Sequence, residues 1–223
     1  MELWELLGVR PGVTALIGGG GKTTAMYSLA RELAAKGTVI CTTTTHILPP
    51  EHLPVLNAAG EDELSAALSA HRCVCLGAPS AEGKLTAPAL PVKTLAARAD
   101  YVLVEADGSK RLPFKAHLPH EPVIPACAGL TVAVAGASGF GRPIRETVHR
   151  WERFCQLTGA FPEDPVTAEN LAVSLAAEGL GDLVFINQAE TASAMAEARR
   201  LAALSSRPVF AGSLRGGIWE CLL

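Results

Sequence analysis

The chain has 223 residues, of which 49% are hydrophobic and 18% are charged, and its formal net charge is −3 at pH 7. This length and apolar content predict one α/β-sized domain over residues 1–223 with a substantial buried core. The small negative charge, without a global basic field, argues against a nucleic acid as partner.

The first residues and the uncharged stretches argue against export and against a membrane. Glu2 and Glu5 stand where a secretory signal carries basic residues, so we expect a cytoplasmic protein. The uncharged stretch 122–140 is long enough to cross a bilayer, but Pro122, Pro125 and several glycines interrupt it. We therefore expect no membrane partner.

A glycine-rich loop is the first informative feature in chain order. A short helix over 2–7 leads into an apolar strand over 13–17, and four glycines, a lysine and two threonines follow. Glycines let backbone N–H groups turn toward phosphates, the lysine can reach the β- and γ-phosphates, and a threonine hydroxyl can bind Mg²⁺. Leu16 takes the place of the first glycine of the full P-loop pattern. The residues expected to hold phosphates are Gly18, Gly19, Gly20, Gly21, Lys22, Thr23 and Thr24.

The next segments predict the fold class. Apolar residues recur at a helical period over 23–36, and a second apolar strand follows over 38–41. Strand, helix and strand within about 30 residues favour a parallel sheet with helices on both faces. We therefore expect an α/β fold, a three-layer α/β/α arrangement similar to that of P-loop NTPases, with a mostly parallel sheet. Its ligand should lie at the carboxyl ends of the strands.

Threonines and a histidine follow the second strand. Thr43 and Thr44 offer hydroxyl ligands for Mg²⁺, and His46 is a candidate for proton transfer. The alternative is that these hydroxyls only cap a strand extension.

Two acids follow the central strand. A helix over 61–70, a strand over 73–76 and a helix over 92–99 precede an apolar strand over 101–104, which ends in Glu105 and Asp107. Side chains two residues apart share a face of an extended chain, so both acids are candidate Mg²⁺ ligands and catalytic groups. One would hold the metal, while the other, or His46, would position water; which acid does which stays open.

A proline-rich insertion spans about residues 107–128. Long irregular loops in compact domains are often functional, and here Lys110, Arg111 and Lys115 offer cations that neutralise phosphoryl charge. Lys115 is the catalytic candidate among them. A metal site made of His117, His120 and Glu121 is the less favoured alternative, because H-x-x-H on a loop is a weak signal.

The last part of the chain continues the alternation of strands and helices. We expect a strand over 131–135, helices over 145–158 and 167–178, a strand over 183–186, a helix over 191–205, and strands over 209–211 and 218–222. Asn187 begins a stretch similar to the N-K-x-D motif that reads guanine, but Gln188 replaces the lysine and Glu190 the aspartate. Asn187 is therefore a nucleotide-binding candidate, and the choice between ATP and GTP stays open.

These motifs together resemble a known family. The stretches LIGGGGKTT, CTTTTHI, VLVEADGSKRLPFKAH with HEPVIP, and FINQAE, in this order, are similar to the YqeC-type accessory proteins of selenium-dependent molybdenum hydroxylases. The resemblance covers most of the chain. It implies a P-loop protein that binds nucleoside triphosphates and assists maturation of a molybdenum hydroxylase, in cofactor or selenium handling. Its implied partners are that hydroxylase or its cofactor-handling proteins.

Three functions fit these observations. The first is a Mg²⁺-dependent NTP hydrolase, an ATPase or a GTPase, whose cycle drives cofactor insertion. The second is a P-loop kinase or nucleotidyl-transfer enzyme that acts on a small acceptor at the 107–121 loop. The third is a nucleotide-responsive binding module with negligible turnover, which docks a hydroxylase subunit. Product analysis separates them, because a hydrolase releases phosphate without an acceptor.

Overall fold

The computed structural model describes residues 1–222 and divides into two compact units. The first unit contains residues 1–16, 23–107 and 123–130, and the second contains residues 17–22, 108–122 and 131–222. The prediction of a single domain over 1–223 stays a prediction, and Leu223 lies outside the described residues.

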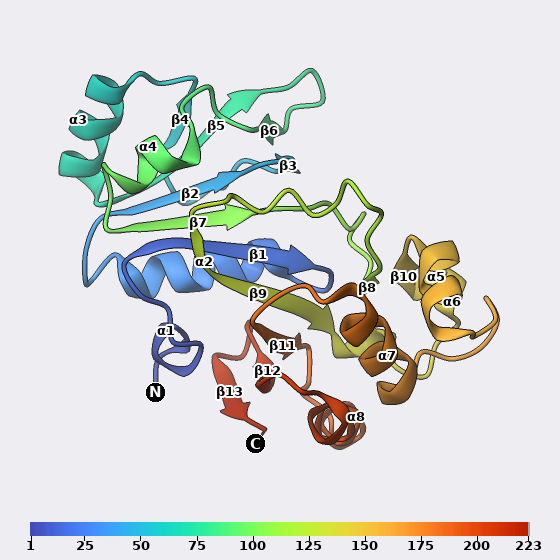
Figure 1. Ribbon diagram of the computed structural model, residues 1–223. Coiled ribbons are helices and arrows are strands. Elements are labelled where there is room, and N and C mark those ends of the chain that lie inside the picture. The colour runs from blue at the N-terminus through green and yellow to red at the C-terminus, as the bar shows by residue number, and fades with distance from the viewer. Residues whose placement is uncertain (223) are drawn as a thin grey trace. The chain divides into compact units, whose positions relative to one another are not determined.

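The first unit is built on a parallel sheet (Figure 1). Four parallel strands lie side by side in the order β1 (Gly12–Gly18), β7 (Tyr101–Glu105), β2 (Val39–Thr43) and β5 (Cys73–Pro79). Three short strands extend this sheet, namely β4 (Val55–Asn57), parallel to β5, and the antiparallel β6 (Leu85–Thr86) and β3 (His46–Ile47). The last two residues of β1 belong to the second unit.

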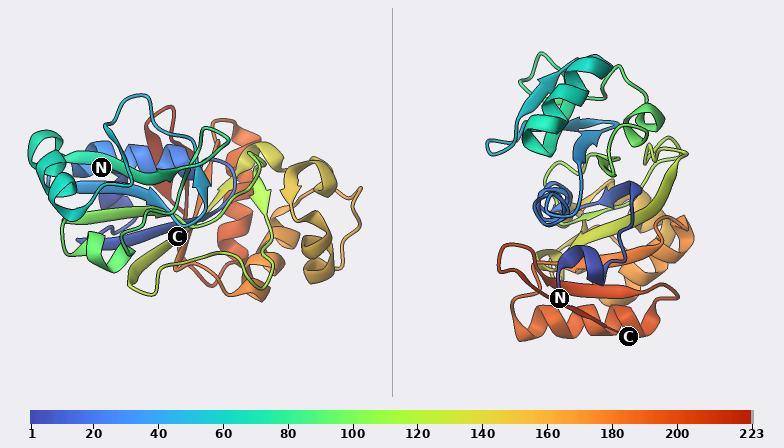
Figure 2. Two further views of the ribbon diagram at one scale, coloured as in Figure 1. Left: turned by 90° about the horizontal axis from the view of Figure 1, so that it is seen from above. Right: turned by 90° about the vertical axis from the view of Figure 1, so that its left-hand side faces the viewer.

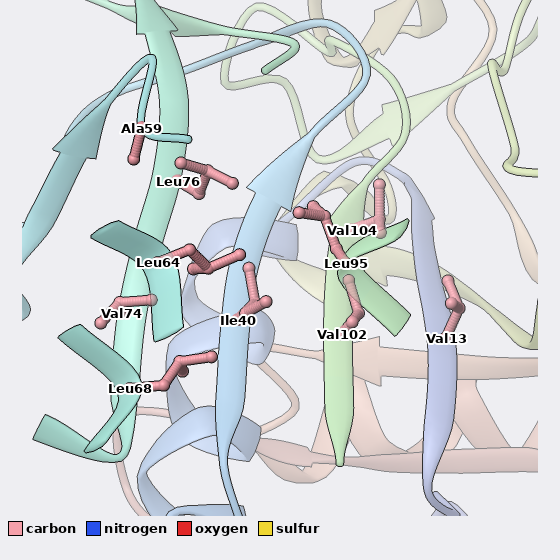
Figure 3. Packing of buried hydrophobic residues seen from close by; sticks show 10 residues of the cluster. All are labelled: Val13, Ile40, Ala59, Leu64, Leu68, Val74, Leu76, Leu95, Val102 and Val104. Carbon is pink, nitrogen blue, oxygen red and sulfur yellow. The ribbon is translucent and has the colours of Figure 1, made fainter. Parts of the chain in front are cut away.

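Helices cover both faces of this sheet. On one face, Leu64 and Leu68 of α3 (Glu61–His71) and Leu95 of α4 (Val92–Ala96) pack against Ile40 and Val102 of the strands (Figure 3). Each buried leucine contributes about 1.5–3 kcal/mol relative to an exposed one. On the other face lies α2 (Lys22–Leu33), which buries its apolar residues Met26, Leu29, Ala30 and Leu33. The short α1 (Leu3–Leu6) precedes β1.

The second unit has its own parallel strands. They are β9 (Ala128–Gly136), β11 (Leu183–Asn187) and β12 (Val209–Ser213), with β13 (Ile218–Cys221) antiparallel to β12. The first three residues of β9 belong to the first unit. The helices α7 (Ala168–Glu178) and α8 (Ala192–Leu204) contact each other, and α8 lies along β12 (Figure 2). No helix within residues 1–222 has both the length and the apolar character that crossing a bilayer requires.

A separate two-stranded element also belongs to the second unit. The parallel pair is β8 (Phe114–Lys115) and β10 (Val148–His149). The 3₁₀ helix Ala137–Gly139 and α5 (Ile144–Thr147) precede β10, and α6 (Trp151–Thr158) follows it.

The predicted α/β class is confirmed, since mostly parallel strands alternate with helices that cover both faces in the first unit. The predicted continuous helix over 145–158 is wrong. Residues 148 and 149 are extended and pair with β8, and Arg150 has a left-handed φ of +65°. The β-branched Val148 favours extended backbone, but the short strand that pairs with Val148 and His149 lies in a proline-rich segment. The hydrophobic periodicity of residues 145–158 does not reveal this pairing with a distant strand.

Candidate functional site

The glycine loop lies against the backbone of β9 within the second unit. Gly18 and Gly20 have left-handed φ values of +93° and +69°. A Cβ at Gly18 would lie 2.3 Å from the Val134 carbonyl oxygen, and one at Gly20 would lie 2.2 Å from the Gly136 nitrogen. Both the backbone conformation and the close approach therefore require glycine at these two positions.

Two amides of the loop already have partners. The Gly19 N–H donates to the Val134 carbonyl at 2.9 Å, and the Gly20 N–H donates to the Leu112 carbonyl at 3.0 Å. The first N–H groups of a helix have no acceptor within that helix, so the first turn of α2, which begins at Lys22, is where backbone donors can meet an anion. A phosphate group would therefore contact backbone N–H groups at the start of α2 rather than those of Gly19 and Gly20.

Lys22 folds back over the glycine loop. It is buried, with 3% of its surface exposed, and its Nζ donates to the Gly18 carbonyl oxygen at 2.7 Å. The same Nζ lies 3.4 Å from Ser109 Oγ. Ser109 carries no motif signal of its own in the sequence. The Gly18 carbonyl and the Ser109 hydroxyl thus help to hold the ammonium group at the loop, close to where a phosphate would lie.

A hydroxyl and a carboxylate meet within the first unit. Thr23 Oγ1, in the first turn of α2, donates to Glu105 Oε2 at the end of β7 at 2.6 Å. Strand register fixes Glu105 beside Thr43 of β2 and Leu16 of β1. Asp107, two residues further on, is buried. The fold thus brings two of the candidate Mg²⁺ ligands, Thr23 and Glu105, into direct contact, and their role in metal binding stays a prediction.

The threonine run anchors the chain around Glu105. Thr43 Oγ1 donates to the Glu105 carbonyl at 2.8 Å, and Thr44 Oγ1 donates to the Val123 carbonyl at 2.8 Å. Thr43 Oγ1 also accepts the Thr45 N–H at 2.9 Å, which leaves one lone pair for a further contact, whereas Thr44 Oγ1 makes only the one hydrogen bond as donor. His46 lies in β3, paired with Thr86 of β6, and is exposed. The structure thus places Thr43 beside the Glu105 backbone and His46 on a surface strand.

The basic insertion is organised by Lys115. The Lys115 side chain is fully buried, its Nζ donates to the Gly108 carbonyl at 2.7 Å, and it lies 3.3 Å from Glu121 Oε1. Burial alone would raise the pKa of Glu121, but Arg150 and Lys115 outweigh it and hold this pKa below its ordinary value. Lys110 and Arg111 are exposed, and both have left-handed φ.

The three residues of the alternative metal site have different partners. His117 forms a buried pair with Glu178 of α7, with 2.8 Å between His117 Nδ1 and Glu178 Oε2. Glu121 pairs with Lys115 and Arg150, and His120 is exposed. Across residues 1–222, no three His, Cys, Asp or Glu side chains group as a metal site would require. The His117, His120 and Glu121 alternative therefore gains no support.

Asn187 holds the glycine loop from the end of β11. Its Nδ2 donates to the Gly20 carbonyl at 2.8 Å, and its Oδ1 accepts the Leu214 N–H at 3.0 Å. Gln188 has a left-handed φ and accepts from Ser138, and Glu190 is exposed. Both ends of the Asn187 amide are thus engaged by backbone, an arrangement that supports the loop itself.

The fold and these contacts define an α/β protein with a glycine loop, a threonine–glutamate contact and a basic insertion. Residues 14–152 match the family described as YqeC protein. The chain is also 36% identical over 170 residues to "Uncharacterized protein YqeC" of Escherichia coli (strain K12), a match that covers 73% of this chain. The aligned region spans 66% of that relative's length, slightly less than two thirds. This chain belongs to the YqeC family, as the resemblance of its motifs predicts.

Proposed function

We propose that this chain binds a nucleoside triphosphate together with Mg²⁺ at the start of α2, and that nucleotide hydrolysis serves maturation of a selenium-dependent molybdenum hydroxylase. Family membership supports the accessory role. The observation that carries the nucleotide site is the 2.6 Å hydrogen bond between Thr23 Oγ1 and Glu105 Oε2.

Oxygen ligands of this kind fit Mg²⁺. Adjacent ligands of an octahedral Mg²⁺ ion, each about 2.0–2.1 Å from the metal, lie about 2.9 Å from each other. Thr23 Oγ1 and Glu105 Oε2 are 2.6 Å apart, so the two oxygens would need to move apart only slightly for both to bind one Mg²⁺ ion. Such an ion would supply positive charge to the β- and γ-phosphates. Lys22 would exchange its carbonyl partner for phosphate oxygens.

Asp107 is the better candidate for orienting the attacking water. It is buried two residues beyond Glu105, whereas His46 is exposed on β3. A base that works on water needs a site from which bulk solvent is excluded, and this favours the buried acid. Lys115 would then act on the transferred phosphoryl charge, or through the insertion that it anchors at Gly108.

Titration of the purified protein with ATP and with GTP, in Mg²⁺ and in EDTA, tests the metal assignment. We expect Mg²⁺ to tighten binding in the natural chain and Glu105→Gln to remove this dependence. Glu63→Gln is the matched control, because Glu63 is exposed on α3 and its loss changes net charge equally. Equal Mg²⁺ dependence in both variants would contradict the assignment of Glu105.

The phosphate contact has its own test. We expect Lys22→Ala to weaken triphosphate binding about 10- to 150-fold, because charge-assisted hydrogen bonds are worth about 1.5–3 kcal/mol. Lys93→Ala, at an exposed lysine of α4, should leave affinity unchanged. Hydroxylase activity in cells that lack this protein, complemented with the natural chain or with Lys22→Ala, then tests the maturation role. Full complementation by Lys22→Ala would show that the maturation role does not require nucleotide binding.

A further inference from the structure

The proline-rich insertion begins with a tight turn that lies within the second unit. The Leu112 N–H donates to the Ser109 carbonyl at 2.9 Å and so closes a four-residue turn over 109–112. Its two central residues, Lys110 and Arg111, have left-handed φ values of +50° and +63°. This combination defines a type I′ turn, whose central positions are normally occupied by glycine, asparagine or aspartate. Lysine and arginine seldom adopt this backbone conformation, so the turn is strained.

The glycine loop and the end of β9 hold this turn in place. The Gly20 N–H donates to the Leu112 carbonyl at 3.0 Å, and the Gly136 N–H donates to the Pro113 carbonyl at 2.8 Å. A Cβ at Gly19 would lie 2.6 Å from the Leu112 carbonyl oxygen, so the insertion could not approach a larger residue as closely. Strained backbone persists only where its surroundings impose it, and it is concentrated at functional sites. The question is therefore what this turn places beside the glycine loop.

The other end of the turn brings a hydroxyl group to Lys22. Ser109 is half-buried, and its Oγ accepts from Lys22 Nζ at 3.4 Å. The carbonyl of the preceding residue, Gly108, accepts from Lys115 Nζ at 2.7 Å. The backbone is therefore held by hydrogen bonds on both sides of Ser109. Because the hydroxyl is the acceptor in its contact with Lys22, its own O–H can still donate.

We propose that Ser109 is a further phosphate-binding residue, whose hydroxyl donates to a phosphate oxygen that Lys22 also binds, and that the strained turn positions this hydroxyl. This inference rests on the proposed triphosphate site and adds a residue to it. Two donor atoms 3.4 Å apart can both lie at the distance of about 2.7–2.9 Å that charge-assisted hydrogen bonds to one oxygen require. Because the turn is formed before the ligand arrives, binding does not have to order it.

Binding of ATP and of inorganic tripolyphosphate to the full chain in Mg²⁺ tests this residue. We expect Ser109→Ala to weaken both ligands by the same factor of about 10, at the lower end of the range for a hydrogen bond to a charged group. Ser69→Ala is the control, because Ser69 is exposed on α3 and its hydroxyl donates to the Ser65 carbonyl. Unchanged affinity of Ser109→Ala for both ligands would overturn the proposal. A loss confined to ATP would also overturn it, since the contact would then be with the nucleoside.

The role of the turn has its own test, in which net charge is matched. Arg111→Asn and Arg111→Val both remove an exposed guanidinium, but asparagine tolerates a left-handed φ and β-branched valine does not. We expect Arg111→Val to bind tripolyphosphate about 5-fold more weakly than Arg111→Asn, because fewer molecules hold the turn that positions Ser109. This difference should disappear when each change is combined with Ser109→Ala. Equal affinity of the two variants, or a difference that persists without the Ser109 hydroxyl, would overturn the positioning role.

The same titrations distinguish this inference from the proposed function. Weaker binding by Lys22→Ala together with unchanged binding by Ser109→Ala would retain the triphosphate site and remove Ser109 from it. A natural chain that does not bind ATP in Mg²⁺ would overturn both proposals. We expect Ser109→Ala to unfold in urea at the same midpoint as the natural chain, so that its loss of affinity arises at the site itself.

Discussion

The carboxyl edge of the sheet in the first unit and the β8–β10 pair in the second unit differ in how their polar side chains are held. At the sheet edge, donors meet acceptors from the chain itself, as in the contacts of Thr23 and Thr43 with Glu105. At the β8–β10 pair, Lys115 and Arg150 share one carboxylate, that of Glu121. The first arrangement brings oxygen ligands together, as a cation requires, and the second joins charged side chains of opposite sign in ion pairs.

The two kinds of contact should contribute differently to the stability of the fold. A hydrogen bond between neutral or oppositely charged partners stabilises the fold before any ligand binds. In a buried ion pair, the cost of removing both charges from water offsets much of their mutual attraction, and the balance depends on the charge of each group. We therefore expect variants at hydrogen-bonded positions to lose stability at any pH, and the stability of the β8–β10 region to depend on pH.

The largest effect is expected at Asn187, whose amide is fully engaged by backbone. Asn187→Ala leaves the Gly20 carbonyl and the Leu214 N–H without this partner. Each buried group left unsatisfied costs about 1–3 kcal/mol, so unfolding in urea should show a loss of about 2–6 kcal/mol for the two groups. Asn57→Ala, at an exposed residue of β4, is the control and should change stability little.

Nucleotide binding by Asn187→Ala also discriminates between two roles for this residue. If Asn187 supports the glycine loop, affinity for ATP and for GTP should fall by the same factor. A selective loss of GTP binding would instead show that Asn187 reads guanine, and unchanged stability would contradict the support role.

A smaller, pH-dependent effect is expected at His149. Its folded pKa of about 4 lies below the ordinary 6.5, so folding favours the neutral ring. This stability is fully present above pH 6.5 and is lost as the pH falls toward 4, by up to about 3 kcal/mol at about 1.4 kcal/mol per pH unit. Urea unfolding at pH 7.5 and pH 4.5 in phosphate-free buffer should show a smaller acid loss in His149→Asn than in the natural chain. His120→Asn, at an exposed histidine, should retain the full acid loss.

Sequence reasoning reached the sheet-edge region because its residues form contiguous motifs. The glycines with Lys22 and Thr23, and the strand that ends in Glu105, each have a local pattern, and their contact follows from parallel strand ends. Family membership was likewise predictable from the order of these motifs.

The β8–β10 region could not be predicted in the same way. Val148 and His149 lie in a stretch whose composition predicts a helix, and their extended backbone pairs with residues 114–115. Glu178, the partner of His117, is 61 residues away in the chain. Contacts of this kind depend on tertiary packing, which overrides local propensity and leaves no periodic signal.

The smallest effect, and the sharpest test of the sheet-edge region, concerns Thr43. Its hydroxyl donates to the Glu105 carbonyl at 2.8 Å, and that of Thr42 donates to the Leu76 carbonyl at the same distance. Both threonines are buried on β2. Thr42→Val removes one neutral hydrogen bond and should cost about 0.5–1.5 kcal/mol of stability, whereas Thr43→Val also removes the bond that Oγ1 accepts from the Thr45 N–H at 2.9 Å and should cost somewhat more. Only Thr43 adjoins Glu105 in the strand register. If Thr43 is also a Mg²⁺ ligand, Thr43→Val should weaken Mg²⁺-dependent nucleotide binding while Thr42→Val does not. Equal Mg²⁺ dependence in the two variants would restrict Thr43 to anchoring the strand end and leave Thr23 as the hydroxyl ligand beside Glu105.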